Sequence, residues 1–249
     1  MHSVLRVVSY NIHKGVRGLG PARRLEIHNL RQAIARLDAD LVCLQEVRKL
    51  NRREEQFFVH WPSQGQADFL APHGHTAVYR SNAITRHGEH GNALLSRWPV
   101  LAHQHADMSD HRFEQRGLLH TELDLRGQRV HVLVLHLGLM RGGRMRQLQQ
   151  VCDYVSRDIA PDAPLIVAGD FNEWNAGVRK VLGDVGLVTP TLQHLPTFPS
   201  ALPLLALDHI YTRGLQPLRQ HVPHGPHWAR MSDHLPIVAE FLLPGKALP

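Results

Sequence analysis

The sequence predicts one α/β or α+β domain, residues 1–249, with a large and mostly antiparallel β core. Three observations lead to this prediction. Short apolar runs recur along the chain, and signals such as Arg126-Gly127-Gln128 join neighbouring runs as hairpins. Two longer segments have apolar residues at helical spacing. No linker, repeat or low-complexity tract divides the chain, whose 249 residues are near the upper limit for one hydrophobic core.

The first elements follow from local patterns near the start of the chain. Residues 4–10 form a Val-rich run that is typical of a β-strand, and glycines mark the loop after it. Residues 22–37 carry Leu and Ile on one helical face with Arg between them, which predicts an amphipathic helix. Residues 40–44 form a short apolar run, for which we expect a buried strand.

The next forty residues are more polar. Residues 47–66 are basic, and we expect a loop there with a short helix near Phe57. Residues 67–90 are rich in His, Gly and Ser, which is typical of loops, and one strand is expected among them at 76–79.

The second half of the chain has clearer patterns. Strands are expected at 93–96, 100–105, 118–125, 130–137, 164–168, 207–211, 218–221 and 235–243. Helical spacing returns over 141–159, and a shorter helix is expected around 176–183. We expect a Pro-rich loop at 190–203 and a frayed tail at 244–249.

Composition narrows the class of protein. Hydrophobic residues make up 43% of the chain and charged residues 20%, which excludes wholesale disorder. No run approaches the roughly 18–20 apolar residues that cross a bilayer, so no transmembrane helix is expected. The net charge of +6 favours polyanionic partners such as nucleic acid, an anionic membrane surface or phosphorylated metabolites. Solubility explains the same charge equally well.

The two cysteines and the start of the chain indicate the compartment. Cys43 and Cys152 lie in apolar runs and lack the spacing of a zinc site, so we expect buried free thiols. The first strand begins within a few residues of Met1, without the charged and apolar leader of an exported protein. We therefore expect a cytoplasmic protein. The 20 His residues fit either metal sites or surface positions, and composition does not decide between them.

Polar residues occur at the ends of several apolar strands. Side chains at strand ends converge on one cleft while the sheet holds them rigid. These residues are Asn11, His13, Gln45, Glu46, His136, Asp170, Asn172, Asp208, His209, Asp233 and His234. Their carboxylate and amide oxygens suit Mg²⁺ or Mn²⁺, whereas zinc prefers Cys and His. A hard cation beside His and Asp is typical of phosphoester hydrolysis.

Each of these residues also has a simpler interpretation. The segment Gly-Asp-Phe-Asn at 169–172 is compatible with an Asx turn after a strand. The pair Asp233-His234 is compatible with a surface pair, Glu46 with a helix cap, and Arg116-Gly117 with a turn. The order and joint occurrence of the segments, rather than any single one, favours a shared site.

The order of these segments resembles that found in the endonuclease/exonuclease/phosphatase superfamily, and the resemblance extends from about residue 4 to residue 243. The matching segments are SYNIHKG (9–15), LQEV (44–47), GNALLSR (91–97), RG (116–117), HLG (136–138), GDFN (169–172), LDHIY (207–211) and SDHLP (232–236). The resemblance implies a DNase I-like, four-layer αββα sandwich of two packed mixed β-sheets flanked by helices. It also implies hydrolysis of phosphoester bonds that depends on Mg²⁺ or Mn²⁺.

The resemblance implies a role for each matching residue. Glu46 would be the principal metal ligand, with Asn11 beside it and Asp233 bound to the metal or its water. Asp170 would orient or deprotonate the attacking water. His234 would contact the scissile phosphate or act as acid and base, with Asp208 holding its ring.

Further roles concern the leaving group and the phosphate. His136 would be a second acid near the leaving group. The expected phosphate contacts are Asn172, Arg116, Asn92 and Lys14. His209 is next to Asp208, but neighbours in a strand face opposite sides, so we expect His209 to point away from the cleft.

The substrate stays open at the level of sequence. A histidine at position 136 resembles the DNase I, sphingomyelinase and inositol-phosphatase branches of the superfamily. The loop before residues 207–211 has one aromatic residue, Phe198, whereas abasic-site endonucleases have an aromatic-rich loop there. We favour nucleic acid, because Arg23-Arg24 and Arg48–Arg53 offer phosphate contacts. The alternative is a phospholipid or inositol phosphate near a membrane, suggested by the apolar loop 202–207. A non-catalytic binding module is disfavoured because the ligand set is complete, and we expect a monomer.

Overall fold

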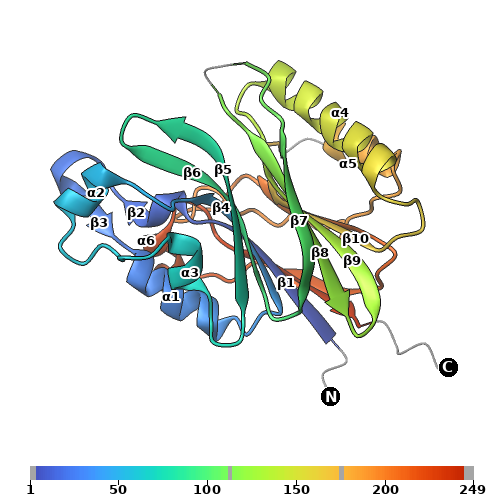
Figure 1. Cartoon of the computed structure of the whole chain (residues 1–249), viewed down its shortest axis with the longest axis horizontal. Coiled ribbons are helices and arrows are strands. Elements are labelled where there is room, and N and C mark those ends of the chain that lie inside the picture. The colour runs from blue at the N-terminus through green and yellow to red at the C-terminus, as the bar shows by residue number, and fades with distance from the viewer. Residues whose placement is uncertain (1–3, 112–113, 174–176, 244–249) are drawn as a thin grey trace.

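The computed structural model describes residues 4–111, 114–173 and 177–243 of the chain. Two β-sheets lie face to face at the centre of the molecule (Figure 1). The first has the order β12-β13-β1-β4-β6-β5 and the second the order β11-β10-β9-β8-β7. β1 with β4 and β9 with β10 are parallel pairs, and the remaining pairs in the two sheets are antiparallel. A mostly antiparallel core is thereby confirmed.

The strands have the following bounds. The first sheet contains β1 (Val4–Asn11), β4 (Leu41–Val47), β5 (Thr76–Thr85), β6 (Gly88–Ser96), β12 (Pro217–His221) and β13 (Ile237–Leu242). The second contains β7 (Val100–Asp107), β8 (Gly117–Leu125), β9 (Gln128–His136), β10 (Leu165–Asp170) and β11 (Asp208–Arg213). A small ribbon joins β2 (Val16–Arg17) to β3 (Arg24–Leu25).

Helices cover the outer faces of both sheets (Figure 1). The first sheet is covered by α1 (Ile27–Arg36), α3 (Gln66–Leu70) and α6 (Pro226–Met231). The second is covered by α4 (Arg141–Asp158) and α5 (Gly177–Gly183). α2 (Arg52–Phe57) follows β4 at the end of the molecule that carries β2 and β3. Short 3₁₀ turns cover His13–Gly15 and Gly20–Ala22.

Three buried apolar clusters hold these four layers together. The cluster between the sheets takes Val132 and Val134 from β9, while Leu133 and Leu135 of the same strand face the α4 side. This alternation is the pattern of a strand buried on both faces. A third cluster fills the space between the first sheet and α1, where Leu30 and Ile34 are fully buried or nearly so. The expected four-layer αββα sandwich is confirmed.

Two sequence expectations differ from the structure. The helix expected from residue 22 begins at Ile27, because Gly20–Ala22 makes a 3₁₀ turn and Arg24–Leu25 pairs with Val16–Arg17. Residues 67–90 were expected to be mainly loops, but most of them form α3 and the long β5–β6 hairpin. Only Val78 and Ala83 of β5 are buried, so its sequence lacks the apolar alternation that indicates a strand.

The remaining expectations are met with small shifts at the ends of elements. Cys43 and Cys152 are buried free thiols, as expected. The short helix α6 was not expected, although Pro226 at its first position is a helix-start signal. The expected tail at 244–249 and the start of the helix expected from residue 176 lie outside the described residues. Within the described chain, no helix combines the length and apolar character needed to cross a bilayer.

Candidate active site

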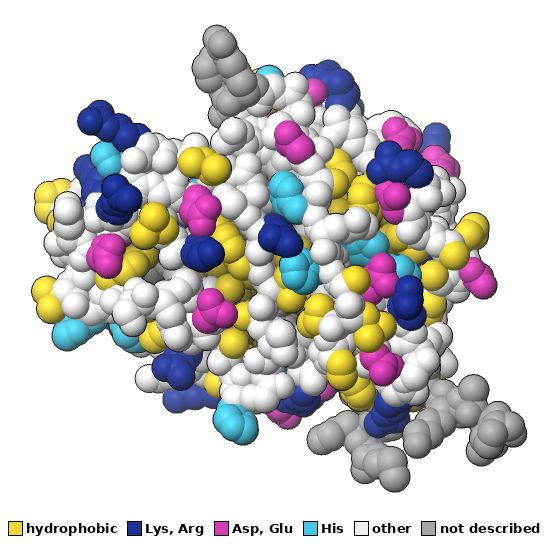
Figure 2. All heavy atoms as spheres, viewed as in Figure 1, with side chains coloured by type: hydrophobic (Ala, Val, Ile, Leu, Met, Phe, Trp, Pro, Cys, Tyr) yellow, Lys and Arg dark blue, Asp and Glu magenta, His cyan; other side chains and the backbone are white. Residues whose placement is uncertain are grey.

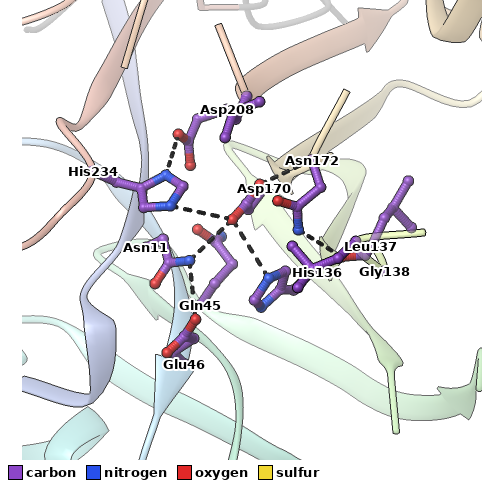
Figure 3. A network of polar contacts seen from close by, with 12 residues as sticks. Asn11, Gln45, Glu46, His136, Leu137, Gly138, Asp170, Asn172, Asp208 and His234 are labelled. Atoms are coloured by element: carbon purple, nitrogen blue, oxygen red, sulfur yellow. Dashed lines mark hydrogen bonds and ion pairs between the residues drawn. The ribbon is translucent and has the colours of Figure 1, made fainter. Parts of the chain in front are cut away.

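Strand ends from both sheets bring polar side chains to one place (Figure 3). Asn11 ends β1 and Glu46 lies near the end of β4 in the first sheet, while His136 ends β9 and Asp170 ends β10 in the second. Each pair belongs to parallel strands, whose carboxyl ends lie at the same edge of a sheet. Because the two sheets pack face to face, the four side chains meet at the seam between them.

Asp170 is the centre of the contacts. Its Oδ2 atom lies 3.0 Å from Asn11 Nδ2, 3.4 Å from His136 Nε2 and 3.6 Å from His234 Nε2. The side chain is buried, and a buried carboxylate is costly unless such partners surround it. Burial raises the pKa of Asp170 above its ordinary value, although His234 and His136 oppose that shift. A carboxylate with a raised pKa is a better proton acceptor near neutral pH.

The Gly-Asp-Phe-Asn segment fixes Asp170 in this position. Gly169 lies against β9 so closely that a Cβ atom would meet the Leu135 carbonyl oxygen. Phe171 is fully buried, and Asn172 has a positive φ of 50°. The Asn172 backbone N–H donates to Asp170 Oδ1 at 2.9 Å, and its Nδ2 donates to the Leu137 carbonyl at 2.8 Å. The segment therefore is an Asx turn, and the turn orients the carboxylate.

His234 and Asp208 form a buried pair. His234 Nδ1 lies 2.8 Å from Asp208 Oδ2, which also accepts a hydrogen bond from Thr197 Oγ1 at 2.6 Å. The Phe198 ring packs against the imidazole with ring centres 5.0 Å apart. Burial by itself would lower the pKa of His234, but Asp208 and Asp170 outweigh it and raise the pKa to about 10. His234 is therefore an imidazolium at neutral pH.

His136 is held in the opposite state. Burial and the nearby Arg116 lower the pKa of His136 to about 4. The imidazole is therefore neutral at neutral pH and contacts Asp170 without carrying charge. Two histidines on either side of one carboxylate thus have pKa values on opposite sides of neutrality, an arrangement that assigns different tasks to each.

Glu46 lies at the other side of Asn11. Its Oε1 is 3.4 Å from Asn11 Nδ2, and its Oε2 is 3.1 Å from Lys14 Nζ. Burial would raise the pKa of Glu46, but His136, Lys14 and His13 together hold it well below its usual range. Glu46 has a positive φ of 56°, a conformation that costs free energy for a residue with a side chain and that recurs at functional sites.

Asp233 approaches from the segment before β13. Its Oδ2 lies 3.1 Å from His13 Nδ1. Burial favours a raised pKa, but the hydrogen bond from His13 and the electrostatic influence of that ring lower the pKa of Asp233 overall. The carboxylates of Asp233 and Glu46 both remain ionised at neutral pH. Together with Asn11 and Asp170 they supply the hard oxygen donors that Mg²⁺ and Mn²⁺ prefer.

In this region another group of three, Asp170, Asp208 and His234, brings its ligand atoms within 4.8 Å of one another. Asp208 and His234 already hydrogen-bond each other, and Thr197 takes a further position on Asp208. A metal ion bound by these three residues would have to displace the proton that makes His234 an imidazolium. The side of the site formed by Glu46 and Asn11 fits a metal better, because there the carboxylate contacts the partly exposed ammonium group of Lys14, at 3.1 Å, rather than a buried imidazolium.

Two other side chains that were expected to contact phosphate differ in how many of their hydrogen-bonding atoms already have a partner. Arg116 pairs with Glu114 Oε1 at 3.2 Å, and among the described residues its buried Nε has no hydrogen-bond partner. Asn92 is fully buried and its Nδ2 donates to the carbonyls of Gly117 and Val134. Asn92 can offer only its Oδ1 to the cleft in this arrangement, so its contact with phosphate stays a prediction.

His209 points away from this group, as strand alternation predicts. Its Nε2 lies 3.1 Å from the Glu173 carbonyl, and its ring packs against Phe171 and Tyr211. It therefore stabilises the layer behind the site.

Sequence reasoning missed several supporting residues. Thr197 hydrogen-bonds Asp208, and Ser232 donates to the Asn11 carbonyl at 2.7 Å across the two ends of the chain. His90 lies in the electrostatic range of Glu46, Lys14, Arg116 and Arg48, and burial lowers its pKa to about 4. Thr197 and Ser232 gave no signal beyond their places next to recognised segments, since hydroxyl residues are common in loops.

Comparison with known proteins decides the family. The family model "Endonuclease/Exonuclease/phosphatase family" matches residues 8–234. The chain belongs to this family. It is therefore a phosphoesterase of a family that depends on divalent metal ions, and the residues described above form its candidate active site.

Relatives and solved structures agree with the assignment. The uncharacterized protein YbhP of Escherichia coli strain K12 is 34% identical over 253 residues, with 96% of each chain covered. An endonuclease/exonuclease/phosphatase structure from Beutenbergia cavernae has a TM-score of 0.80 at 20% identity, covering 98% of this chain and 72% of that one. D. rerio TDP2 complexed with single-strand DNA product has a TM-score of 0.66 at 18% identity, covering 96% and 99%.

The charged His234 predicts a pH dependence of stability in metal-free protein. A folded-state pKa of about 10, above the ordinary value of about 6.5, stabilises the fold fully below pH 6.5. That stability is lost as pH rises through 10. Urea unfolding at pH 6.5 and pH 10 in EDTA should show a larger fall in the free energy of unfolding for the wild type than for Asp208→Asn, whose His234 lacks its main counter-charge.

The exposed His227, changed to Asn, serves as the matched control and should behave as the wild type. If Asp208→Asn and the wild type lose the same stability between the two pH values, the assigned charge of His234 is wrong.

Proposed function

We propose that this phosphoesterase is a Mg²⁺- or Mn²⁺-dependent phosphodiesterase that acts on nucleic acid. The observation that carries the proposal is the convergence on Asp170 Oδ2 of an amide, a neutral imidazole and a charged imidazolium, with Glu46 next to them. This set contains a proton acceptor, a cation for the phosphate and a carboxylate for a metal. Family membership supports the reaction class, and the substrate and residue roles are our inference.

Glu46, Asn11 and Asp233 would hold the metal ion. The two carboxylates are ionised and the three side chains offer oxygen atoms, which are the donors of a Mg²⁺ site. When bound, the ion supplies Lewis-acid neutralisation of the phosphate charge. The position of Lys14 supports a cation site at Glu46, since its ammonium group already lies against that carboxylate.

Asp170 would take the proton of the attacking water. The water oxygen bonds to phosphorus, its proton passes to Asp170 Oδ2, and the bond from phosphorus to the leaving oxygen breaks. Asn11 donates to the same Oδ2 atom and orients the carboxylate. The Asn172 N–H holds the other oxygen, so the accepting atom stays aimed at the seam between the sheets.

His234 and His136 would serve the phosphate and the leaving group. The His234 imidazolium donates Nε2–H to a phosphate oxygen while Asp208 holds Nδ1–H. His136 is neutral in the free protein, and a phosphate oxygen beside it would raise its pKa toward that of a proton donor for the leaving oxygen. Asn172 has one amide hydrogen left after its bond to Leu137, which suits a further phosphate contact.

Cationic side chains around Glu46 favour a polyanion. Lys14, Arg48 and Arg116 all act electrostatically on His90, next to the candidate metal site. D. rerio TDP2, whose fold is similar, was solved with single-strand DNA product. The two Arg clusters expected from the sequence are less available, because Arg23 and Arg48 both pair with Glu54. The face in Figure 2 mixes both signs of charge, so the +6 is not gathered there.

A lipid phosphoester is the second candidate, and one observation favours it. Leu202 and Leu204 are 66% and 61% exposed in the loop between Phe198 and Asp208. The base of this loop is bound to the site through Thr197 and Phe198. Exposed leucines next to a phosphoester site can enter a membrane surface. Leu207 is buried, as expected for a residue leading into a core strand.

Removing either of two principal groups should slow hydrolysis strongly. Glu46→Gln takes a charged oxygen from the metal site, and kcat/KM should fall by at least about 100-fold. His234→Asn removes the imidazolium, and kcat should fall by about 10² to 10⁴-fold. Initial rates on a phosphodiester substrate with Mg²⁺ or Mn²⁺ measure both. The exposed His227, changed to Asn, should keep full activity, and full activity in both site variants would contradict the assignment.

Two experiments test the substrate class: the salt dependence of binding affinity, and hydrolysis of a panel of phosphoesters. With about three phosphate contacts, affinity for single-strand DNA should fall roughly 20-fold between 50 and 200 mM salt. Arg116→Gln should reduce the slope of log affinity against log salt by about one, whereas Arg36→Gln on the far helix α1 should not change it.

Vesicles of phosphatidylcholine and phosphatidylglycerol complete the panel. If DNA and RNA stay intact with either metal while lipid headgroups are released, the nucleic-acid proposal fails and the lipid candidate replaces it.

A further inference from the structure

A second cluster of metal-ligating side chains lies on the second sheet, away from the candidate active site. Glu122 of β8 is the direct register partner of His131 of β9, and His120 stands two residues before Glu122 on the same face of β8. One ligand atom from each lies within 4.8 Å of the others. The strand register therefore places two imidazoles and one carboxylate side by side.

This cluster is separate from the site already described. His131 is near the start of β9 and His136 at its end, so about 17 Å of strand lies between them. The two residues also face opposite sides of the sheet, since five positions separate them. His131 lies on the side that α4 covers, where Tyr154 contacts His120.

The two imidazoles direct ring nitrogens at the same place. His120 Nε2 and His131 Nδ1 are 2.9 Å apart, so either a hydrogen-bonding proton lies between them or a bound cation takes the place of that proton. His120 Nδ1 is 2.9 Å from the Tyr154 hydroxyl, which Gln104 Nε2 contacts at 2.6 Å. A partner on the far ring nitrogen is the usual support of a metal-bound histidine, since it fixes the ring and the tautomer.

The surroundings suit a neutral, ligating pair. Both histidines are buried, and burial disfavours the charged imidazolium. Neutral imidazole is the form that binds metal. Glu122 is 22% exposed and pairs with Arg129, which is itself 64% exposed and at the molecular surface. An ion therefore has an entry path at Glu122, and Arg129 can move aside into solvent.

We propose that His120, His131 and Glu122 bind a divalent transition-metal ion of the zinc class, and that the ion clips β8 to β9 beneath α4. Two imidazole nitrogens and one carboxylate form the ligand set that zinc accepts, with a fourth position for water. Magnesium prefers oxygen ligands alone. The site differs in chemistry from the oxygen-rich catalytic centre, and it stands whether or not the proposed substrate is right.

Co²⁺ distinguishes the two sites by its coordination geometry. Tag-free protein is stripped with EDTA, given excess Mg²⁺ to occupy oxygen ligands, and titrated with Co²⁺. We expect the intense visible absorption of four- or five-coordinate Co²⁺ to saturate at one equivalent in the wild type. Zn²⁺ should remove that absorption, and at 100 times its dissociation constant it should raise the Tm by roughly 5–10 °C.

Matched variants assign the signal to the cluster. His131→Gln should lose the Co²⁺ absorption and the Zn²⁺-induced rise in Tm while keeping Mg²⁺-dependent hydrolysis within about twofold. His103→Gln removes an exposed histidine of β7 and should keep both signals, which controls for surface histidines. Glu122→Gln, at a partly exposed position, should weaken binding at least tenfold if His131→Gln fails to fold.

The proposal is overturned if the wild type takes up no Co²⁺ of this geometry. It is also overturned if His131→Gln and Glu122→Gln, when folded, bind Co²⁺ as the wild type does. In either case the two imidazoles share a proton, and the cluster is a buried hydrogen-bond network only.

Discussion

A carboxylate buried at the seam between two sheets is the constraint on which the site depends. Asp170 belongs to the second sheet, yet Asn11 of the first sheet is its shortest side-chain contact, at 3.0 Å. His234, from the segment before β13 of the first sheet, also reaches it, and His234 is held by Asp208 of the second. A buried charge without such partners would be strongly destabilising. The packing of the sheets and the geometry of the site therefore depend on each other.

The same constraint separates the charges of the two histidines. Asp208 and Asp170 face His234 together, so the imidazolium is stabilised even though it is buried. His136 meets Asp170 as well, but Arg116 and burial keep it neutral. One carboxylate between a charged and a neutral imidazole can accept a proton without losing its orientation. The positive φ angles of Glu46 and Asn172 fit this view, because a packed scaffold can hold strained backbone where function needs it.

The fold could be predicted to the level of its layers, and so could the convergence of several strand-end side chains on one place. Val-rich runs and helical spacing located β1, β9 and α4, because burial on one or both faces leaves a periodic pattern. Parts of the β5–β6 hairpin were expected at 76–79 and 93–96, but residues 80–90 between them escaped, because they are mostly exposed or half-buried and carry no such pattern. Glu46, Asp170 and His234 were named from segment order, but Thr197 and His90 were not, because their proximity arises only when distant loops and strands pack.

The most direct test of this view replaces the Asp170 carboxylate with an amide. Asp170→Asn keeps the shape of the side chain and removes a buried charge. It should lower phosphodiester hydrolysis by at least about 10³-fold in protein that still unfolds cooperatively. Metal-dependent initial rates measure the first, and urea unfolding on the same protein checks the second. An Asp170→Asn protein that hydrolyses phosphodiesters at the wild-type rate would contradict the central role of this carboxylate.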